Sequence, residues 1–223
     1  MRFAAIIPAR GGSQRIPRKN LASVGGRTLV DLAICAALGA GIHDVTVSTD
    51  DVVIGEHAEI CGASWLVRPE ALSKGTPSAD GGSSTEVVMT HWWRSMVGGK
   101  PDAIVLLQPT SPLRTAAHVL GALALLESSG ADSVMACVKN PRAHFAGRAY
   151  PREGWTQFRG FGPAGYRPRT QDARSIIEDC GAIYVTRRAA WEMTGLRNGG
   201  TVAAYLMSED DAIDVDEVED LER

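Results

Sequence analysis

Short runs of apolar residues alternate with longer amphipathic segments along most of this chain. The run at 103–107 is apolar at every position, which is typical of a parallel strand buried on both faces. Shorter or less uniform runs predict further strands at 3–7, 44–48, 64–67 and 133–138. The intervening segments have the composition and the terminal glycines of helices, at 29–38, 52–61, 83–96 and 116–128. This alternation predicts an α/β fold with a doubly wound, mostly parallel sheet, whose ligand crevice lies at the carboxyl ends of the strands.

The segment 140–177 breaks this pattern, because it is rich in proline, glycine, arginine and aromatic residues and has no clear period. Two interpretations remain open: a long surface loop, or an excursion that packs against another surface. The aromatic residues Trp155, Phe158, Phe161 and Tyr166 favour the second, since exposed aromatic side chains usually find a partner. A length of 223 residues fits one domain over 1–223, with 140–177 as an insertion.

A loop with two adjacent glycines and several cations follows the first predicted strand. Gly11 and Gly12 let the backbone turn its N–H groups towards an anion, and the cations supply the opposing charge. These cations are Arg10, Arg15, Arg18 and Lys19. We therefore expect a bound polyphosphate here, with a solvated basic turn as the alternative. The chain has neither GxxxxGKS/T nor a GxGxxG after this strand, which excludes the P-loop and the dinucleotide-binding loop.

The overall charge and the cysteines exclude several other classes of protein. A formal net charge of −3 argues against a nucleic-acid-binding protein. The cysteines lack the spacing of a zinc site, so we expect reduced thiols in a cytoplasmic protein. They are Cys35, Cys61, Cys137 and Cys180. No apolar run approaches the length of a membrane span, and the run before the first loop is too short for a signal-peptide core.

Four segments resemble the cytidylyltransferases that activate sialic acid and related sugar acids. They are IPARGGSQRIPRKNL at 7–21, VSTDD at 47–51, LLQPTSPLR at 106–114 and IDVDEVEDLE at 213–222. The resemblance spans almost the whole chain, and it implies a Mg²⁺-dependent enzyme that transfers CMP from CTP to an acidic acceptor and releases pyrophosphate. It also implies a homodimer, in which 140–177 packs against the second subunit and contributes to acceptor binding.

The resemblance implies a nucleotide site on the first loop and on two later turns: Ala9, Arg10, Gly11, Gly12, Ser13, Lys19, Asn20, Arg68 and Ser78. Arg10 and Lys19 are expected to clamp the phosphates and to act in catalysis. For Ser78, a helix N-cap is the competing role. Arg15 stands where the family often has glycine, and it is either an additional phosphate ligand or a surface charge.

Asp214 and Asp216 alternate around Val215, so on an extended strand both carboxylates point the same way. Converging hard oxygen ligands suit Mg²⁺, which bridges to phosphate oxygens. Ile213 and Val215 favour a buried strand, whereas the many neighbouring acids leave a solvated acidic tail as the alternative. The family resemblance places catalytic metal ligands at these two aspartates.

The resemblance implies an acceptor site on the turn after the central strand and on the insertion: Gln108, Ser111, Arg114, Lys139, Arg142, Arg169 and Gln171. An arginine such as Arg169 suits the acceptor's anion. The chain departs from members that use sialic acid, because Glu178-Asp179-Cys180-Gly181 stands where they commonly have R-P-N-G. Two acceptor classes therefore remain open: a nonulosonic acid of the sialic, legionaminic or pseudaminic type, and a small, highly charged phosphonate.

A non-catalytic nucleotide-binding protein is the alternative from another class. The chain retains the two phosphate-binding cations and the two aspartates, which argues against it. Preference for CTP over other nucleotides also stays open, because base choice depends largely on backbone contacts that a sequence does not reveal.

Overall fold

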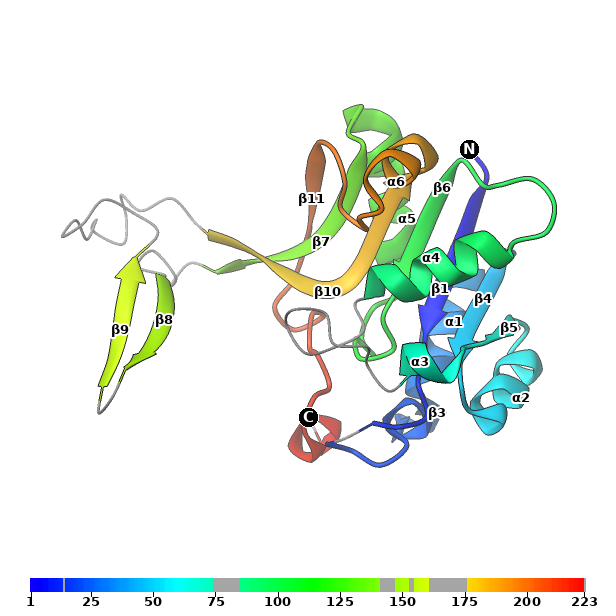
Figure 1. Ribbon diagram of the computed structural model, residues 1–223, viewed down its shortest axis with the longest axis horizontal. Helices are drawn as coiled ribbons and strands as arrows, with labels where there is room; N and C mark the ends of the chain where they lie inside the picture. The colour runs from blue at the N-terminus through cyan, green and yellow to red at the C-terminus, as the bar shows by residue number, and fades with distance from the viewer. Residues whose placement is uncertain (14, 74–84, 141–146, 153–154, 161–175, 223) are drawn as a thin grey trace.

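A sheet of seven strands forms the centre of the molecule (Figure 1). The computed structural model describes residues 1–13, 15–73, 85–140, 147–152, 155–160 and 176–222. The strand order is β11-β7-β10-β6-β1-β4-β5, and among these described strands β10 alone runs antiparallel to its neighbours. The prediction of a doubly wound, mostly parallel sheet is confirmed. The strands are β1 (Phe3–Pro8), β4 (Val45–Thr49), β5 (Ser64–Val67), β6 (Ala103–Leu107), β7 (Ser133–Asn140), β10 (Ile176–Arg187) and β11 (Val202–Met207).

Helices cover both faces of this sheet. On one face lie α1 (Leu29–Gly39), α2 (Val52–Ile60) and α5 (Ala116–Ser129), and on the other lie α4 (Thr85–Ser95) and α6 (Arg188–Thr194). The shorter helices are η1 (Lys19–Leu21), α3 (Glu70–Ser73) and η2 (Val218–Glu222). The predictions for α1, α2 and α5 are each correct to within one residue at either end. The helix predicted at 83–96 corresponds to α4, and its first two residues lie outside the described part of the chain.

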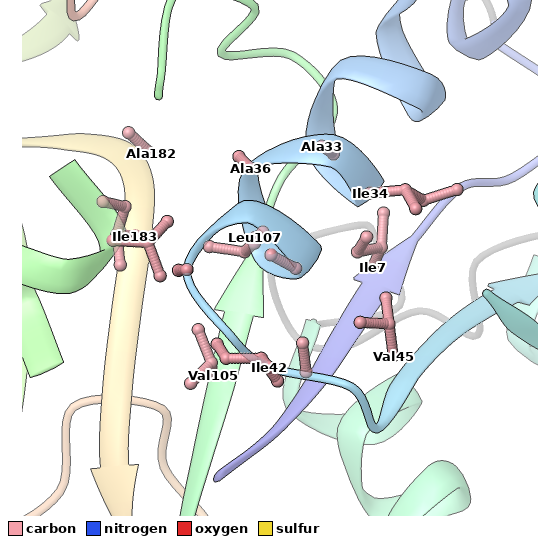
Figure 2. Close-up of a cluster of buried hydrophobic side chains, with 14 of the residues drawn as sticks. Ile7, Ala33, Ile34, Ala36, Ile42, Val45, Val105, Leu107, Ala182 and Ile183 are labelled. Atoms are coloured by element: carbon pink, nitrogen blue, oxygen red, sulfur yellow. The ribbon is translucent and has the colours of Figure 1, made fainter. Parts of the chain in front are cut away.

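Alternate residues of the central strands point to opposite faces of the sheet, which explains why these strands are apolar throughout. In β1, Ile7 joins the core beneath α1, whereas Ile6 joins the core beneath α4. Figure 2 shows the first of these cores, in which Ile34 of α1 lies beside Ile7, with Val45 in the same cluster. Burying one such side chain contributes about 1.5–3 kcal/mol relative to exposing it. The central strands are therefore held by helices on both sides.

Short polar side chains determine where the helices begin. Thr28 accepts a hydrogen bond from the amide of Asp31 at the start of α1, and Asp51 accepts one from the amide of Val53 at the start of α2. Thr115 caps α5 in the same way. A cap of this kind contributes about 1 kcal/mol. Because Asp51 follows β4 so closely, α2 begins at the carboxyl edge of the sheet.

β10 is the largest element that the apolar pattern did not predict. It lies between β6 and β7 and pairs antiparallel with both, with Ile183 opposite Leu107 and Ile176 opposite Asn140. Its first half therefore reaches the carboxyl ends of the parallel strands, where ligands bind in folds of this kind. β11 was also not predicted, and it pairs in parallel with β7.

Two small antiparallel hairpins complete the described structure. β2 (Ser23–Val24) pairs with β3 (Arg27–Thr28), and β8 (Gly147–Arg152) pairs with β9 (Trp155–Gly160). Figure 1 shows the β8–β9 hairpin to the side of the sheet, beyond the ends of β7 and β10. An antiparallel excursion thus occupies part of the predicted insertion at 140–177. Within the described residues, no helix has the length and apolar character that crossing a membrane requires.

The predicted strand around Ile213 and Val215 is wrong. Residues 212–216 form an irregular segment that pairs with no strand, and η2 follows it. The amide of Val215 instead donates a single hydrogen bond of 2.7 Å to the carbonyl oxygen of Thr110. Val215 is fully buried, whereas Asp214 and Asp216 on either side of it are exposed. The alternation that suggested a strand therefore reflects one apolar anchor between two exposed acids.

Candidate active site

The first loop leaves the carboxyl end of β1 and is tied to β4 and to itself. The amide of Ala9 donates to the carbonyl oxygen of Ser48 over 2.9 Å. Asn20 is 5% exposed, and its Nδ2 donates to the carbonyl oxygen of Arg10 over 2.8 Å. Asn20 therefore holds the two ends of the loop together, and its contact with a nucleotide stays a prediction. The side chain of Arg10 is exposed at the edge of the sheet.

Asp50 accepts a hydrogen bond from one of the glycine amides that the sequence analysis expected to face a phosphate. The amide of Gly11 donates to Asp50 Oδ1 over 2.8 Å. Burial works to raise the pKa of the Asp50 carboxyl, but hydrogen bonds from Gly11 and Ser73 and the charge of Arg68 outweigh it, so that this pKa lies below its usual range. The amide of Ser13 also has a partner, the Gly11 carbonyl oxygen at 3.1 Å. The main-chain amides of Gly11 and Ser13, two residues of the predicted nucleotide site, are thus engaged within the protein.

Arg68 is a buried cation next to the first loop. It is 6% exposed, and its guanidinium donates to the carbonyl oxygen of Ser48 over 2.8 Å and to Ser48 Oγ over 3.4 Å. Burial lowers the pKa of Arg68 and nearby Arg10 lowers it further, whereas Asp50 opposes both effects. Arg68, Asp50 and Arg10 therefore form one electrostatic group at the carboxyl ends of β1 and β4.

Lys19 connects the first loop to the C-terminal segment. Its Nζ donates to the carbonyl oxygen of Val215 over 2.7 Å and to Asp216 Oδ1 over 3.0 Å. Beneath this contact, Ile16 of the loop, Leu29 of α1 and Val215 form a small buried apolar cluster. The segments around residues 19 and 216, far apart in the sequence, are therefore packed together as well as paired by charge.

The two C-terminal aspartates share one electrostatic environment. Although Asp214 is exposed at the surface, neighbouring protein atoms partly desolvate its carboxyl and thereby raise its pKa. The carboxylates of Asp216 and Asp220 raise this pKa further, whereas a hydrogen bond with Thr110 and the charge of Lys19 oppose the increase. A metal cation placed beside Asp214 and Asp216, in addition to Lys19, would reduce the repulsion between their two carboxylates. Among the described residues, no group of three or more histidine, cysteine, aspartate and glutamate side chains is arranged to hold a metal ion. Two carboxylates do fit Mg²⁺, because this ion keeps waters and takes further oxygens from phosphates.

The turn after β6 carries Gln108 and is held from below by Arg114. Arg114 is 3% exposed, and its Nη1 donates to the carbonyl oxygens of Gln108 and Ala182 over 2.8 and 2.9 Å. Burial lowers the pKa of Arg114 to about 10. Arg114 Nε has no hydrogen-bond partner within the described structure, and the same is true of the buried Oγ of Ser111. This position favours a supporting role for Arg114 over the direct acceptor contact that the sequence predicted.

A bulge in β10 faces the Gln108 turn. The register shifts between Asp179 and Tyr184, and Gly181 has a φ of 74°, which favours glycine. Both oxygens of Asp179 are used, since Oδ1 accepts from the Gly181 amide at 2.9 Å and Oδ2 from the Tyr184 hydroxyl at 2.6 Å. A Cβ at position 181 would lie only 3.6 Å from Gln108 Nε2. The bulge and the turn thus form neighbouring walls at the carboxyl edge of the sheet.

The structure brings together most of the predicted site residues that it describes. Arg10, Lys19, Arg68, Gln108, Asp214 and Asp216 all come from segments that meet at one edge of the sheet. Lys139 is exposed near the end of β7. Four predicted residues lie outside the described part of the chain: Ser78, Arg142, Arg169 and Gln171.

Sequence reasoning missed three residues that shape this site. Asp50 orders the first loop, Ser48 holds Arg68, and Thr110 contacts the C-terminal segment through its main chain and side chain. All three lie within VSTDD or LLQPTSPLR, and each of these segments spans the end of a buried strand and the turn after it. The presence of polar residues at the end of a buried strand was therefore the available signal.

Several solved structures share this fold, and two of them serve as examples. A CMP:2-keto-3-deoxy-manno-octonic acid synthetase solved with CTP aligns with a TM-score of 0.64 and 19% identity, covering 93% of this chain and 90% of that one. A 4-diphosphocytidyl-2C-methyl-D-erythritol synthase from Anaerococcus prevotii aligns with a TM-score of 0.62 and 12% identity, covering 98% and 94%. At these identities the alignments establish the likeness of fold alone.

Sequence relatives give closer matches. N-acylneuraminate cytidylyltransferase B of Danio rerio is 32% identical over 216 residues, which cover 96% of this chain and 48% of the relative. The chain thus spans about half the length of the first curated relatives that it matches. Pseudaminic acid cytidylyltransferase of Campylobacter jejuni is 30% identical over 225 residues, which cover all of this chain and 94% of the relative. Residues 4–145 also match the sequence model of the family described as Cytidylyltransferase. The match to this family model, together with the relative of nearly equal length, shows that this chain belongs to the cytidylyltransferase family.

Proposed function

We propose that this chain is a Mg²⁺-dependent cytidylyltransferase that transfers CMP from CTP to a nonulosonic acid and releases pyrophosphate. The observation that carries this proposal is the contact between Lys19 and Asp216, at 3.0 Å. It brings a cation suited to phosphate and a carboxylate suited to a metal ion to the same point of the crevice. Membership of the cytidylyltransferase family supports CTP as the nucleotide.

The residues of the crevice suggest how they serve this reaction. Arg10 and Lys19 neutralise the phosphates, and Asn20 and Asp50 keep the loop that carries them in shape. When bound at Asp214 and Asp216, Mg²⁺ would neutralise charge on the phosphate oxygens. An acceptor hydroxyl oxygen attacks the α-phosphorus as its proton passes to solvent water, and the bond from this phosphorus to the bridging oxygen breaks. Pyrophosphate then leaves.

The proposed acceptor site lies on the other side of the metal pair. Gln108 and the β10 bulge supply its described walls. Lys139 at the end of β7 is proposed to complete it, together with Arg142, Arg169 and Gln171 from the insertion. The acceptor class is proposed from the relatives, two of which are named for N-acylneuraminate and pseudaminic acid. We also propose a cytoplasmic homodimer in which 140–177 contacts the second subunit. Sedimentation as a monomer at micromolar concentration would contradict the dimer.

Pyrophosphate release tests the reaction directly. The purified protein is incubated with Mg²⁺ and each of CTP, UTP, ATP and GTP, together with sialic, legionaminic or pseudaminic acid or a simple phosphonate. We expect release with CTP and one nonulosonic acid. Release with a phosphonate alone would replace the acceptor class, and CTP binding without release for any acceptor would favour a non-catalytic nucleotide-binding protein.

Replacing Gly11 with alanine is expected to weaken CTP binding by at least about tenfold. A Cβ at this position would lie 2.7 Å from the Cβ of Asp51, so the loop has to move away from the start of α2. That movement breaks the hydrogen bond from Gly11 to Asp50 and misplaces the phosphate-binding cations, an effect on the scale of a lost charged hydrogen bond. CTP affinity is measured by calorimetry.

Gly12→Ala is the matched control, because a Cβ there would meet no atom within 4 Å. It alters the flexibility of the same loop without forcing it away from the start of α2. We expect its CTP affinity to stay within about threefold of the unaltered protein. Equal losses in both variants would mean that loop flexibility matters here and that the close approach to Asp51 does not.

A further inference from the structure

Both carboxylate oxygens of Asp216 are occupied by cations of the first loop. Lys19 Nζ lies 3.0 Å from Oδ1, and Arg15 Nη1 lies 3.2 Å from Oδ2. Arg15 also lies 3.3 Å from Oε1 of Glu217. The carboxylate proposed to bind a metal is therefore already neutralised by the loop proposed to bind phosphates.

In this arrangement a metal ion and a polyphosphate each have to break the same ion pairs before they can bind. A divalent cation that approaches Asp216 has to displace, or tolerate, two positive side chains. A polyphosphate that approaches the loop has to draw those same side chains away from a carboxylate. Each ligand alone therefore meets an opposing contact, and each removes the opposing contact of the other. Coupling of this kind is reciprocal, so that either ligand raises the affinity for the second.

Arg15 is better suited than Lys19 to change partners. Lys19 is 15% exposed and is also held by the main chain at Val215. Arg15 is 60% exposed, and its two described partners are the exposed side chains of Asp216 and Glu217. Its long side chain can therefore leave Asp216 without breaking a buried contact, and a guanidinium binds phosphate as well as carboxylate.

We propose that Arg15 is a positioning residue that couples polyphosphate binding to metal binding by exchanging Asp216 for the phosphates. The proposal rests on the proposed function, because it takes Asp214 and Asp216 as the metal pair and the first loop as the phosphate site. Without nucleotide, Arg15 holds Asp216. With nucleotide, Arg15 turns to the phosphates, and Oδ2 of Asp216 becomes available to the metal ion.

The test measures each ligand alone, so that chelation of the metal by CTP does not interfere. Mn²⁺ binding in the absence of nucleotide is followed by electron paramagnetic resonance, and CTP binding in EDTA is followed by calorimetry. In Arg15→Gln we expect Mn²⁺ to bind about two- to fivefold more tightly, the range for an exposed ion pair. We expect CTP in EDTA to bind roughly three- to tenfold more weakly, less than for a buried charged contact.

Arg18→Gln is the matched control, since it removes the same charge from the same loop. Arg18 is exposed, and the described structure gives its side chain no ion pair. We expect Mn²⁺ affinity to change by less than about twofold in this variant, which separates the specific contact from the general loss of positive charge. Equal tightening of Mn²⁺ binding in both variants would overturn the proposal.

The direction of the two changes distinguishes coupling from a structural role. If Arg15 only stabilised the fold, Arg15→Gln would weaken both ligands and lower the melting temperature, and that result would also overturn the proposal. Asp214→Asn separates this inference from the proposed function. When Asp214→Asn abolishes Mn²⁺ binding and Arg15→Gln leaves it unchanged, the metal pair stands and the coupling is wrong. When the unaltered protein binds no Mn²⁺, both are wrong.

Discussion

Replacing Asp216 with asparagine is expected to lower the rate of pyrophosphate release by about 10²–10³-fold, as for other lost electrostatic contacts to a transition state. The substitution keeps the shape of the side chain but removes one of the two carboxylates proposed to hold Mg²⁺. It also removes the charge that faces Lys19 and Arg15. The rate is measured at saturating CTP, acceptor and Mg²⁺, so that weaker binding does not account for the loss.

The fold should survive this change, because the Asp216 side chain is 53% exposed and exposed ion pairs contribute about 0–1 kcal/mol. Glu219→Gln is the matched control, since it removes an exposed carboxylate from the same acidic segment. It should leave the rate within about twofold. A near-normal rate for Asp216→Asn at saturating Mg²⁺ would contradict the assignment of this aspartate to the metal.

The elements predicted well from the sequence are those determined by neighbouring residues. The all-apolar run at 103–107 is β6 with no change of bounds, because a strand buried on both faces needs apolar residues throughout. Helix α5 begins where Thr115 can cap it and ends at Gly130, which has a φ of 70°. Caps and glycines of this kind act over a few residues, and therefore the sequence reveals them directly.

The elements missed depend on contacts between distant segments. β10 lies between β6 and β7 although it follows a long insertion, and no local pattern indicates that an antiparallel strand enters a parallel sheet there. The C-terminal segment resembled a strand because Val215 alternates with acids, yet it pairs with no described strand, and the Val215 amide donates to the carbonyl oxygen of Thr110 in a turn. Pairing of this kind becomes visible only when the whole fold is known.

In the candidate site, too, the features with local sequence signals were predicted and the contacts between distant segments were not. The motifs identified the segments that meet at the carboxyl edge, and the first three of them begin within the buried strands β1, β4 and β6. They did not reveal the contacts between these segments. Asp50 accepts a hydrogen bond from the Gly11 amide, and Asp216 forms ion pairs with both Lys19 and Arg15. The sequence therefore predicted which residues lie in the crevice, whereas the structure supplies their partners.

Replacing Arg114 with methionine is expected to destabilise the protein by about 2–4 kcal/mol, the largest loss of stability among these variants. Two effects oppose each other. Burial lowers the pKa of Arg114 to about 10, which marks an unfavourable desolvation of the guanidinium that methionine avoids. Against this, the carbonyl oxygens of Gln108 and Ala182 lose charged donors worth about 1.5–3 kcal/mol each. The second effect should win, because Ala182 is fully buried and water cannot readily replace the donor.

For a protein of this size, that loss lowers the melting temperature by roughly 5–15 °C. Arg188→Met is the matched control, because Arg188 is exposed and should tolerate the change with little loss. Below the melting transition, Arg114→Met should raise the KM for the acceptor and leave CTP affinity nearly unchanged, since Arg114 supports the Gln108 turn and does not touch the first loop. If Arg114→Met keeps its stability but loses acceptor binding, Arg114 contacts the acceptor directly. A residue that only supports the Gln108 turn would lower the stability of the protein when it is replaced.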